Sequence, residues 1–260
     1  NHSYGYVRGW LKYGSWYWYG DININPTEDY LFGFYSERSR IWDEVANASP
    51  YCLIVSSAGN DRGEGPEPGT EHLYWDSIIN GWKTSTMVRD LDGGADGYDC
   101  LPEGNSTAKN LLVVGAVEDF IPDADTSSVE MTFFSAWGPA DDGRIKPDIC
   151  GNGYALYSCS DESDSEYIIY SGTSMASPNV CGTLALIHDY YIDLNGGRKL
   201  KAASVKGLAL HTARNAGDHG GPDYRFGWGL LDALEASRVI EEDASGGEAL
   251  IVEMTLLEGT

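Results

Sequence analysis

The stretch that decides the fold is Tyr170-Ser171-Gly172-Thr173-Ser174-Met175-Ala176-Ser177-Pro178. It places Ser174 between a polar turn and a long segment whose apolar residues recur at helical spacing, at Val180, Leu184, Ile187 and Tyr191. Ser174 is therefore expected at a helix N-terminus, where free N–H groups and the helix dipole favour developing negative charge. Pro178 is expected within the first turns, where the missing donor of proline costs least.

A serine before a helix most often serves only as an N-cap. Here, however, the seven residues from Gly172 to Pro178 resemble the nucleophile motif of the subtilisin-like serine peptidases, the subtilases. The resemblance implies that Ser174 is the nucleophile of a peptide-hydrolysing enzyme and that the substrate is a polypeptide.

Other segments resemble further subtilase motifs, and they occur in the family's order. Ser56 to Asn60 resembles the segment that ends in the oxyanion-hole asparagine, and Asn1 to Gly5 resembles a strand end that lines the substrate cleft. The remaining matches are Phe134–Pro139, Lys146–Asp148 and Tyr224–Gly229. The resemblance implies two edges for the pocket that takes the residue before the scissile bond: Ser3, Tyr4 and Gly5 on one side, and Ser57, Ala58 and Gly59 on the other.

The chemistry agrees with these assignments. An acyl-enzyme mechanism needs an exposed serine oxygen, and it needs donors aimed at the oxyanion of the tetrahedral intermediate. The backbone N–H of Ser174 and the side-chain amide of Asn60 can act as those donors. No cofactor is required for this reaction.

The chain departs from the subtilase pattern at the histidine motif. None of its five histidines is followed by Gly-Thr, and they are His2, His72, His188, His211 and His219. The resemblance implies an Asp motif and a His motif that both precede the oxyanion asparagine. We therefore expect a missing N-terminal segment of the same protein to act as a partner, and we expect the 260-residue chain alone to be inactive.

The pattern of elements predicts an α/β fold, with a doubly wound and mainly parallel sheet that is incomplete at its N-terminus. Residues 1–240 are expected to form a partial peptidase domain with a polar insertion at 61–110, and residues 241–260 a linker and the start of a following strand. Residues 4–20, rich in tyrosine and tryptophan, are expected to form a long loop. Helices are expected at 36–48, from Ser174 to about 193, at 200–213 and up to about 239. Strands are expected at 51–55, 111–117 and 131–134, with a turn and another short strand within 141–149, and residues 166–170 lead into the stretch that contains Ser174.

Composition limits the classes of partner. The chain carries a formal net charge of −23, which disfavours nucleic acid and anionic membrane surfaces as partners. No apolar run is long enough to span a membrane, and the subtilase resemblance implies a secreted or extracytoplasmic protein. The five cysteines leave two alternatives open, a Cys150–Cys159 disulfide or free thiols.

A second candidate site is the acidic stretch from Asp90 to Asp99. Carboxylates at alternating positions with glycines between them can converge on Ca²⁺, which predicts a structural calcium site at Asp90, Asp92, Asp96 and Asp99. The alternative is a solvated acidic turn.

Two other functions remain alternatives to a peptidase. A non-catalytic subtilase-like protein could keep the fold for binding or scaffolding. An esterase of the α/β-hydrolase type is disfavoured because Gly-x-Ser-x-Gly is not formed around Ser174.

Overall fold

The computed structural model describes residues 1–94, 97–119, 126–246 and 249–254. Its centre is a parallel sheet of β3 (Val55–Ser57), β6 (Leu112–Val117) and β7 (Ile149–Asn152), in the order β3-β6-β7. The start of the chain lies beside β3, where His2 and Ser56 form a parallel bridge. Every residue of β6 is buried, as expected for a central strand that is covered on both faces.

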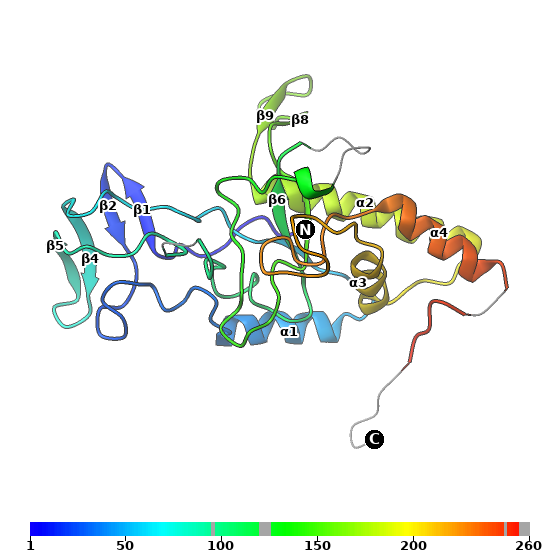
Figure 1. Ribbon diagram of the computed structural model, residues 1–260, viewed down its shortest axis with the longest axis horizontal. Coiled ribbons are helices and arrows are strands. Elements are labelled where there is room, and N and C mark those ends of the chain that lie inside the picture. The colour runs from blue at the N-terminus through cyan, green and yellow to red at the C-terminus, as the bar shows by residue number, and fades with distance from the viewer. Residues whose placement is uncertain (95–96, 120–125, 247–248, 255–260) are drawn as a thin grey trace, which may run out of the picture.

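Helices cover both faces of this sheet (Figure 1). Leu112, Val114 and Ala116 of β6 belong to a cluster with α2 (Thr173–Leu194), α3 (Ala202–His211) and α4 (Ala233–Ala244). Val113, which alternates with them, belongs to a second cluster that contacts Trp42 of α1 (Glu37–Ala48). The doubly wound α/β fold is confirmed.

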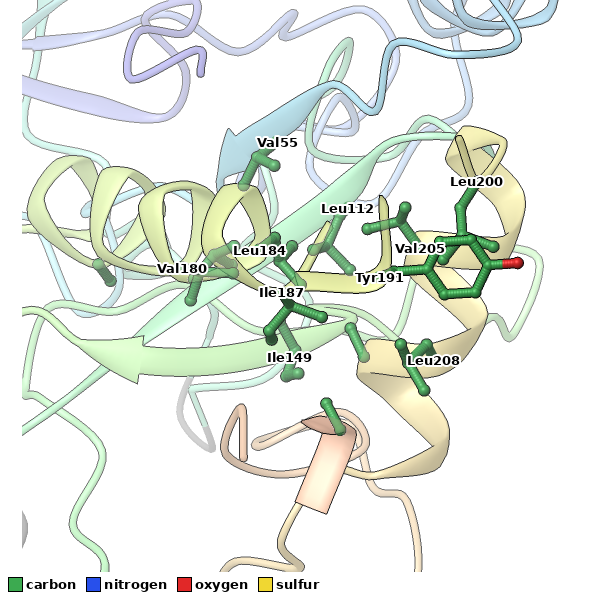
Figure 2. Close-up of a cluster of buried hydrophobic side chains, with 14 of the residues drawn as sticks. Val55, Leu112, Ile149, Val180, Leu184, Ile187, Tyr191, Leu200, Val205 and Leu208 are labelled. Carbon is green, nitrogen blue, oxygen red and sulfur yellow. The ribbon is translucent and has the colours of Figure 1, made fainter. Parts of the chain in front are cut away.

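The predicted stripe of α2 is the face that packs on the sheet. Figure 2 shows Val180, Leu184 and Ile187 directed from the helix toward the side chains of Leu112 and Ile149. Tyr191, fully buried at the far end of the same stripe, packs with α3. Burying this stripe anchors the helix whose N-terminus carries Ser174.

Helix α1 starts where its sequence predicts, and its buried side includes a charged residue as well as Trp42. The Ser36 side chain accepts the N–H groups of Arg38 and Ser39 and caps the helix. Ile41 is 48% exposed, whereas Asp43 is buried, because the Asp43 carboxylate accepts the N–H groups of the segment before β6. Hydrogen bonding to that segment, rather than apolar spacing, orients α1.

The prediction of a long loop over residues 4–20 is wrong. Residues in this stretch form a hairpin of β1 (Trp10–Tyr13) and β2 (Ser15–Trp18), which turns at Gly14 with a φ of 71°. The segment 61–110 adds β4 (His72–Asp76) and β5 (Gly81–Ser85), and the four strands form a sheet in the order β1-β2-β4-β5. This sheet lies at one end of the long axis of the molecule (Figure 1).

Several other helices and strands begin or end at residues different from those predicted, or do not form. Residues 131–134 form no strand, and only Met131 bridges to Val117. Helix α4 continues to Ala244, through the start of the expected linker, and the described residues 249–254 form no strand. The hairpin of β8 (Leu156–Cys159) and β9 (Tyr167–Tyr170) leads into α2, and a short 3₁₀ turn spans Thr126–Ser128.

The alternative of a Cys150–Cys159 disulfide is wrong. Both residues are free thiols, with Cys150 buried and Cys159 exposed. The Sγ of Cys150 donates to the carbonyl of Phe226 at 3.5 Å, which places it in the core and away from solvent.

Among the described helices, none combines the length and hydropathy needed to cross a bilayer.

Candidate active site

Ser174 is the second residue of α2 and faces a pocket. Its hydroxyl donates to the carbonyl of Ser3 at 3.0 Å. Its backbone N–H lies in the first turn, where helix geometry gives it no intrahelical acceptor. Within the described parts of the chain no other acceptor is found for it, so this N–H is available to a ligand.

Pro178 explains how Ser174 is joined to the start of the chain. It is the sixth residue of α2, within the first two turns as expected, and its missing N–H leaves the carbonyl of Ser174 without the usual partner four residues on. The hydroxyl of Ser3 donates to that carbonyl instead, at 3.3 Å. Ser3 and Ser174 are therefore joined by two hydrogen bonds in opposite directions.

Asn60 follows β3 and is oriented by Thr173. Its Oδ1 accepts from the backbone N–H of Thr173 at 2.9 Å and from the Thr173 hydroxyl at 2.8 Å. Its Nδ2 lies toward the nucleophile turn, 3.6 Å from where a Cβ on Gly172 would stand. In the described structure Nδ2 donates to no protein acceptor. The sequence did not predict that Thr173 orients Asn60. The position of Thr173 directly before Ser174 could have indicated a residue close to the site.

A cavity of about 210 Å³ brings the predicted site residues together. Its lining includes Ser174, Asn60, Ser3, Tyr4, Gly5, Ser57 and Gly59. Ala58 does not line it, because it is fully buried behind the pocket and its N–H donates to Val114. The Nδ2 of Asn105 connects the two edges, since it donates to the carbonyl of Tyr4 and to the hydroxyl of Ser56.

One wall of the pocket extends well beyond the predicted residues. The lining continues along the chain from Gly5 through Arg8 to Leu11, and it also includes Asp61, Pro102 and Ser106. These residues were missed because the aromatic stretch was expected to form a loop. Their direct continuation from Ser3-Tyr4-Gly5 is the signal that could have found them.

Arg8 is held by a buried carboxylate. Glu103, 2% exposed, pairs with the guanidinium groups of Arg8 and Arg38 and accepts from the hydroxyl of Ser36. Burial alone would raise the pKa of Glu103, but these hydrogen bonds outweigh it and lower that pKa. Through Glu103, the pocket-lining residue Arg8 is therefore connected to Ser36 and Arg38 at the start of α1.

Asp61 brings an unusual carboxyl group to the pocket. Burial raises its pKa to about 6, and the pKa of Glu64 nearby is also raised, by burial and by the charge of Asp61. The pocket wall therefore contains one carboxyl group, that of Asp61, whose pKa of about 6 is close to neutral.

No histidine lies at Ser174 in the described structure. His2 hydrogen-bonds to the Tyr4 hydroxyl, His72 to Arg89, and His188 accepts the N–H of Leu200. His211 and His219 are exposed and lie away from the pocket. The described site thus brings the Ser174 hydroxyl beside two free N–H donors, those of Ser174 and Asn60, and places no histidine next to them.

Asp90 and Asp92 of the predicted calcium site differ in their surroundings. Asp92 is buried and accepts the N–H of Trp10, whereas Asp90 is exposed. Across the described residues, no three His, Cys, Asp or Glu side chains are grouped to hold a metal ion. Asp96 lies outside the described residues, so the complete set of Asp90, Asp92, Asp96 and Asp99 stays a prediction.

Comparison with solved structures shows the same fold. The structure of patellamide maturation protease PatA aligns with a TM-score of 0.52 and 20% identity, over 81% of this chain and 59% of that chain. Among curated proteins, C5a peptidase of Streptococcus pyogenes is 30% identical over 138 residues, and pyrolysin of Pyrococcus furiosus is 43% identical over 61 residues. The first match covers 50% of this chain but 11% of C5a peptidase, and the second covers 24% of this chain but 4% of pyrolysin.

The model of the Subtilase family matches residues 1–229, which include the whole pocket with Asn60 and Ser174. Peptidases of this family are hydrolases that act on polypeptides. The chain belongs to the subtilase family.

Proposed function

We propose that this chain forms the nucleophile half of a serine endopeptidase. One observation carries the proposal: the Oδ1 of Asn60 is occupied by Thr173, while its Nδ2 and the N–H of Ser174 remain free beside the same pocket. Two free donors next to a serine hydroxyl are the arrangement that stabilises an oxyanion. An N-cap role would not require Asn60 to be oriented in this way.

In the proposed reaction, the Oγ of Ser174 attacks the peptide carbonyl carbon and forms the tetrahedral intermediate, whose oxyanion accepts from Asn60 and from the N–H of Ser174. The C–N bond then breaks, and the serine proton passes through a general base to the departing amine. Water releases the acyl group by the reverse proton path. Ser3, Tyr4 and Gly5 face Ser57 and Gly59 across the pocket that would hold the residue before the scissile bond.

We propose that the general base and its orienting acid come from another segment of the same protein, and that this chain alone is catalytically incompetent. The positions of all five histidines support this, since none contacts Ser174. Loss of the base alone costs about a millionfold in kcat in subtilisin.

A fluorophosphonate probe tests both statements. We expect very slow labelling at Ser174, none in Ser174→Ala, and rapid stoichiometric labelling once the base-containing segment is added. Rapid labelling of the isolated chain would refute the incompetence. Labelling that stays slow after the segment is added would instead favour a non-catalytic subtilase-like binding or scaffold protein, which the lack of a base at Ser174 also favours.

Two weaker proposals rest on the family resemblance. The protein is placed outside the cytoplasm, and the acidic stretch from Asp90 to Asp99 binds structural calcium. Calorimetry in EDTA and in excess Ca²⁺ tests the second, since an unchanged melting temperature would exclude a stabilising site.

A further inference from the structure

The four-stranded sheet has one face that is buried and charged and another that is open and uncharged. The strand register assigns each side chain to a face, because paired residues point to the same side. On the first face, Trp10, Trp18 and His72 are each about 2% exposed or less, and the guanidinium group of Arg89 lies 3.9 Å from the centre of the Trp18 ring. The segment around Arg89 therefore covers that face.

The opposite face, called here the aromatic face, carries no charged side chain at any strand position. It consists of Leu11, Tyr13, Ser15, Tyr17, Leu73, Trp75, Trp82 and Thr84. Such a face is unusual in a chain with 22% charged residues and a net charge of −23. Large open apolar patches on soluble proteins commonly mark binding surfaces.

Trp82, on the edge strand β5, is the ring of the aromatic face that contacts the most other rings. Its ring makes edge-to-face contacts with Tyr17 at 5.1 Å, with Tyr19 at 5.4 Å and with Trp75 at 5.5 Å. Even within this cluster Trp75 and Trp82 remain 39% and 38% exposed, and Tyr13 at the rim is 82% exposed. The rings are thus pre-ordered by one another and still accessible, which lowers the entropy cost of binding.

The aromatic face is continuous with the candidate active site. Leu11 belongs to this face and also lines the pocket that contains Ser174. The wall from Tyr4 to Leu11 runs from the nucleophile to the sheet, and Tyr4 to Val7 are all exposed. A polypeptide lying extended along this wall would need about eight residues to reach the aromatic face.

We propose that the aromatic face binds an apolar, aromatic-containing segment of the polypeptide substrate, about eight residues N-terminal to the scissile bond. This rests on the proposed function, because it takes the pocket at Ser174 as the place of cleavage. A carbohydrate fits less well, because sugar hydroxyls need carboxylate or amide partners beside the stacking rings, and the strand positions of this face have neither.

Peptide binding to the chain, measured by fluorescence anisotropy, tests the proposal without needing turnover. A short apolar peptide probes the pocket alone. The same peptide is extended at its N-terminus by about eight residues that contain leucine and tryptophan, and a matched extension replaces these with serine. We expect the apolar extension to tighten binding at least about tenfold and the serine extension to leave it unchanged.

Variants then locate the effect. Trp82→Asp should abolish the gain from the apolar extension, and Tyr13→Asp, at the exposed rim, should reduce it without endangering the fold. Tyr157→Asp is the matched control, because Tyr157 is 69% exposed on the separate β8–β9 hairpin, and it should leave the gain intact. Binding of the short peptide should be the same in all three variants.

Three outcomes would overturn the proposal: equal affinities for the apolar and serine extensions, a gain that survives both Trp82→Asp and Tyr13→Asp, or binding of cellohexaose that competes with the apolar extension. If the short peptide binds normally in any of these cases, the proposed function stands and only the role of the aromatic face fails. If neither the short nor the extended peptide binds, both fail.

Discussion

Asn60 has two polar ends, and the fold uses only one of them. Thr173 donates twice to the amide oxygen, which fixes the plane of the amide and directs the NH₂ group toward the nucleophile turn. The acceptor end of Asn60 is thus structural and the donor end is free for chemistry. Substitutions that alter one end at a time can separate these roles.

Asn60→Asp keeps an oxygen for Thr173 but replaces the donor by a second acceptor. With the base-containing segment added, we expect the rate of fluorophosphonate labelling at Ser174 to fall about a hundred- to a thousandfold, the loss measured when subtilisin loses one oxyanion-hole donor. The melting temperature should change little. Asn60→Ala is the comparison, and it should lose both labelling rate and stability because the hydroxyl of Thr173 then has no acceptor. Equal labelling of Asn60→Asp and the parent would rule out Asn60 as a donor.

Asp61 makes stability depend on pH. Burial raises the pKa of Asp61 from its ordinary value of 3.8 to about 6, so the folded state favours the protonated form. Its contribution is fully present below pH 3.8 and is lost as the pH rises through about 6. Asp61→Asn should therefore flatten this part of the profile and raise the melting temperature at pH 7.

Calorimetry between pH 4 and 8 measures that effect. The exposed Asp164, changed to Asn, is the matched control and should leave the profile unaltered. An unchanged profile in Asp61→Asn would contradict the raised pKa.

At the scale of elements, α3 is capped by a distant residue. Its N-cap position is Lys201, whose side chain makes no capping bond. The carboxylate of Glu253 accepts the N–H of Lys201 at 2.7 Å and the hydroxyl of Ser204 at 2.6 Å. A negative group at this end also interacts favourably with the helix dipole.

Glu253→Ala should lower the free energy of unfolding by about 1 kcal/mol, the usual cost of losing a cap. Glu253→Gln should cost less, because an amide oxygen can still accept. Urea denaturation of the two variants measures this difference. The exposed Glu242, changed to Ala, is a control for charge alone, and an equal loss there would contradict the capping role.

Elements set by local chemistry were predictable from the sequence, and those set by tertiary contacts were not. The stripe of α2 and the strand around Val113 follow from contiguous patterns. The β1–β2 hairpin was missed because aromatic residues occupy both faces of its strands, which removes the alternation that marks a strand. The burial of Asp43 in α1 could not be predicted, because it depends on hydrogen bonds to Lys109 and Asn110, far along the chain.

The residues of the candidate site also fall into two groups, those that the sequence predicted and those that only the fold brings together. Ser174, Asn60 and the two predicted pocket edges lie in short contiguous motifs. The wall from Tyr6 to Leu11 and the carboxyl group of Asp61 became visible only when the fold placed them in one cavity. The role of Pro178 could not be predicted from the sequence. Pro178 frees the carbonyl of Ser174, and the hydroxyl that donates to this carbonyl belongs to Ser3, far away in the sequence.

At the scale of the whole molecule, charge repulsion opposes folding. A net charge of −23 on 260 residues destabilises the compact state, and salt screens it. We expect the melting temperature to rise between about 10 mM and 0.5 M NaCl, where the screening length falls from about 30 Å to less than 8 Å. Scanning calorimetry measures this, with sucrose at matched osmolality as the uncharged control. A flat response to NaCl would show that the acidic groups are already compensated within the fold.

The pair of bonds between Ser3 and Ser174 also has a consequence in time. The two residues are 171 positions apart, so roughly 10 to 30 s of synthesis separates their appearance at ordinary ribosomal speeds. Throughout that interval the carbonyl of Ser3 exists without the hydroxyl that donates to it. The orientation of the Ser174 side chain is therefore fixed only after both segments have been synthesised and have folded together.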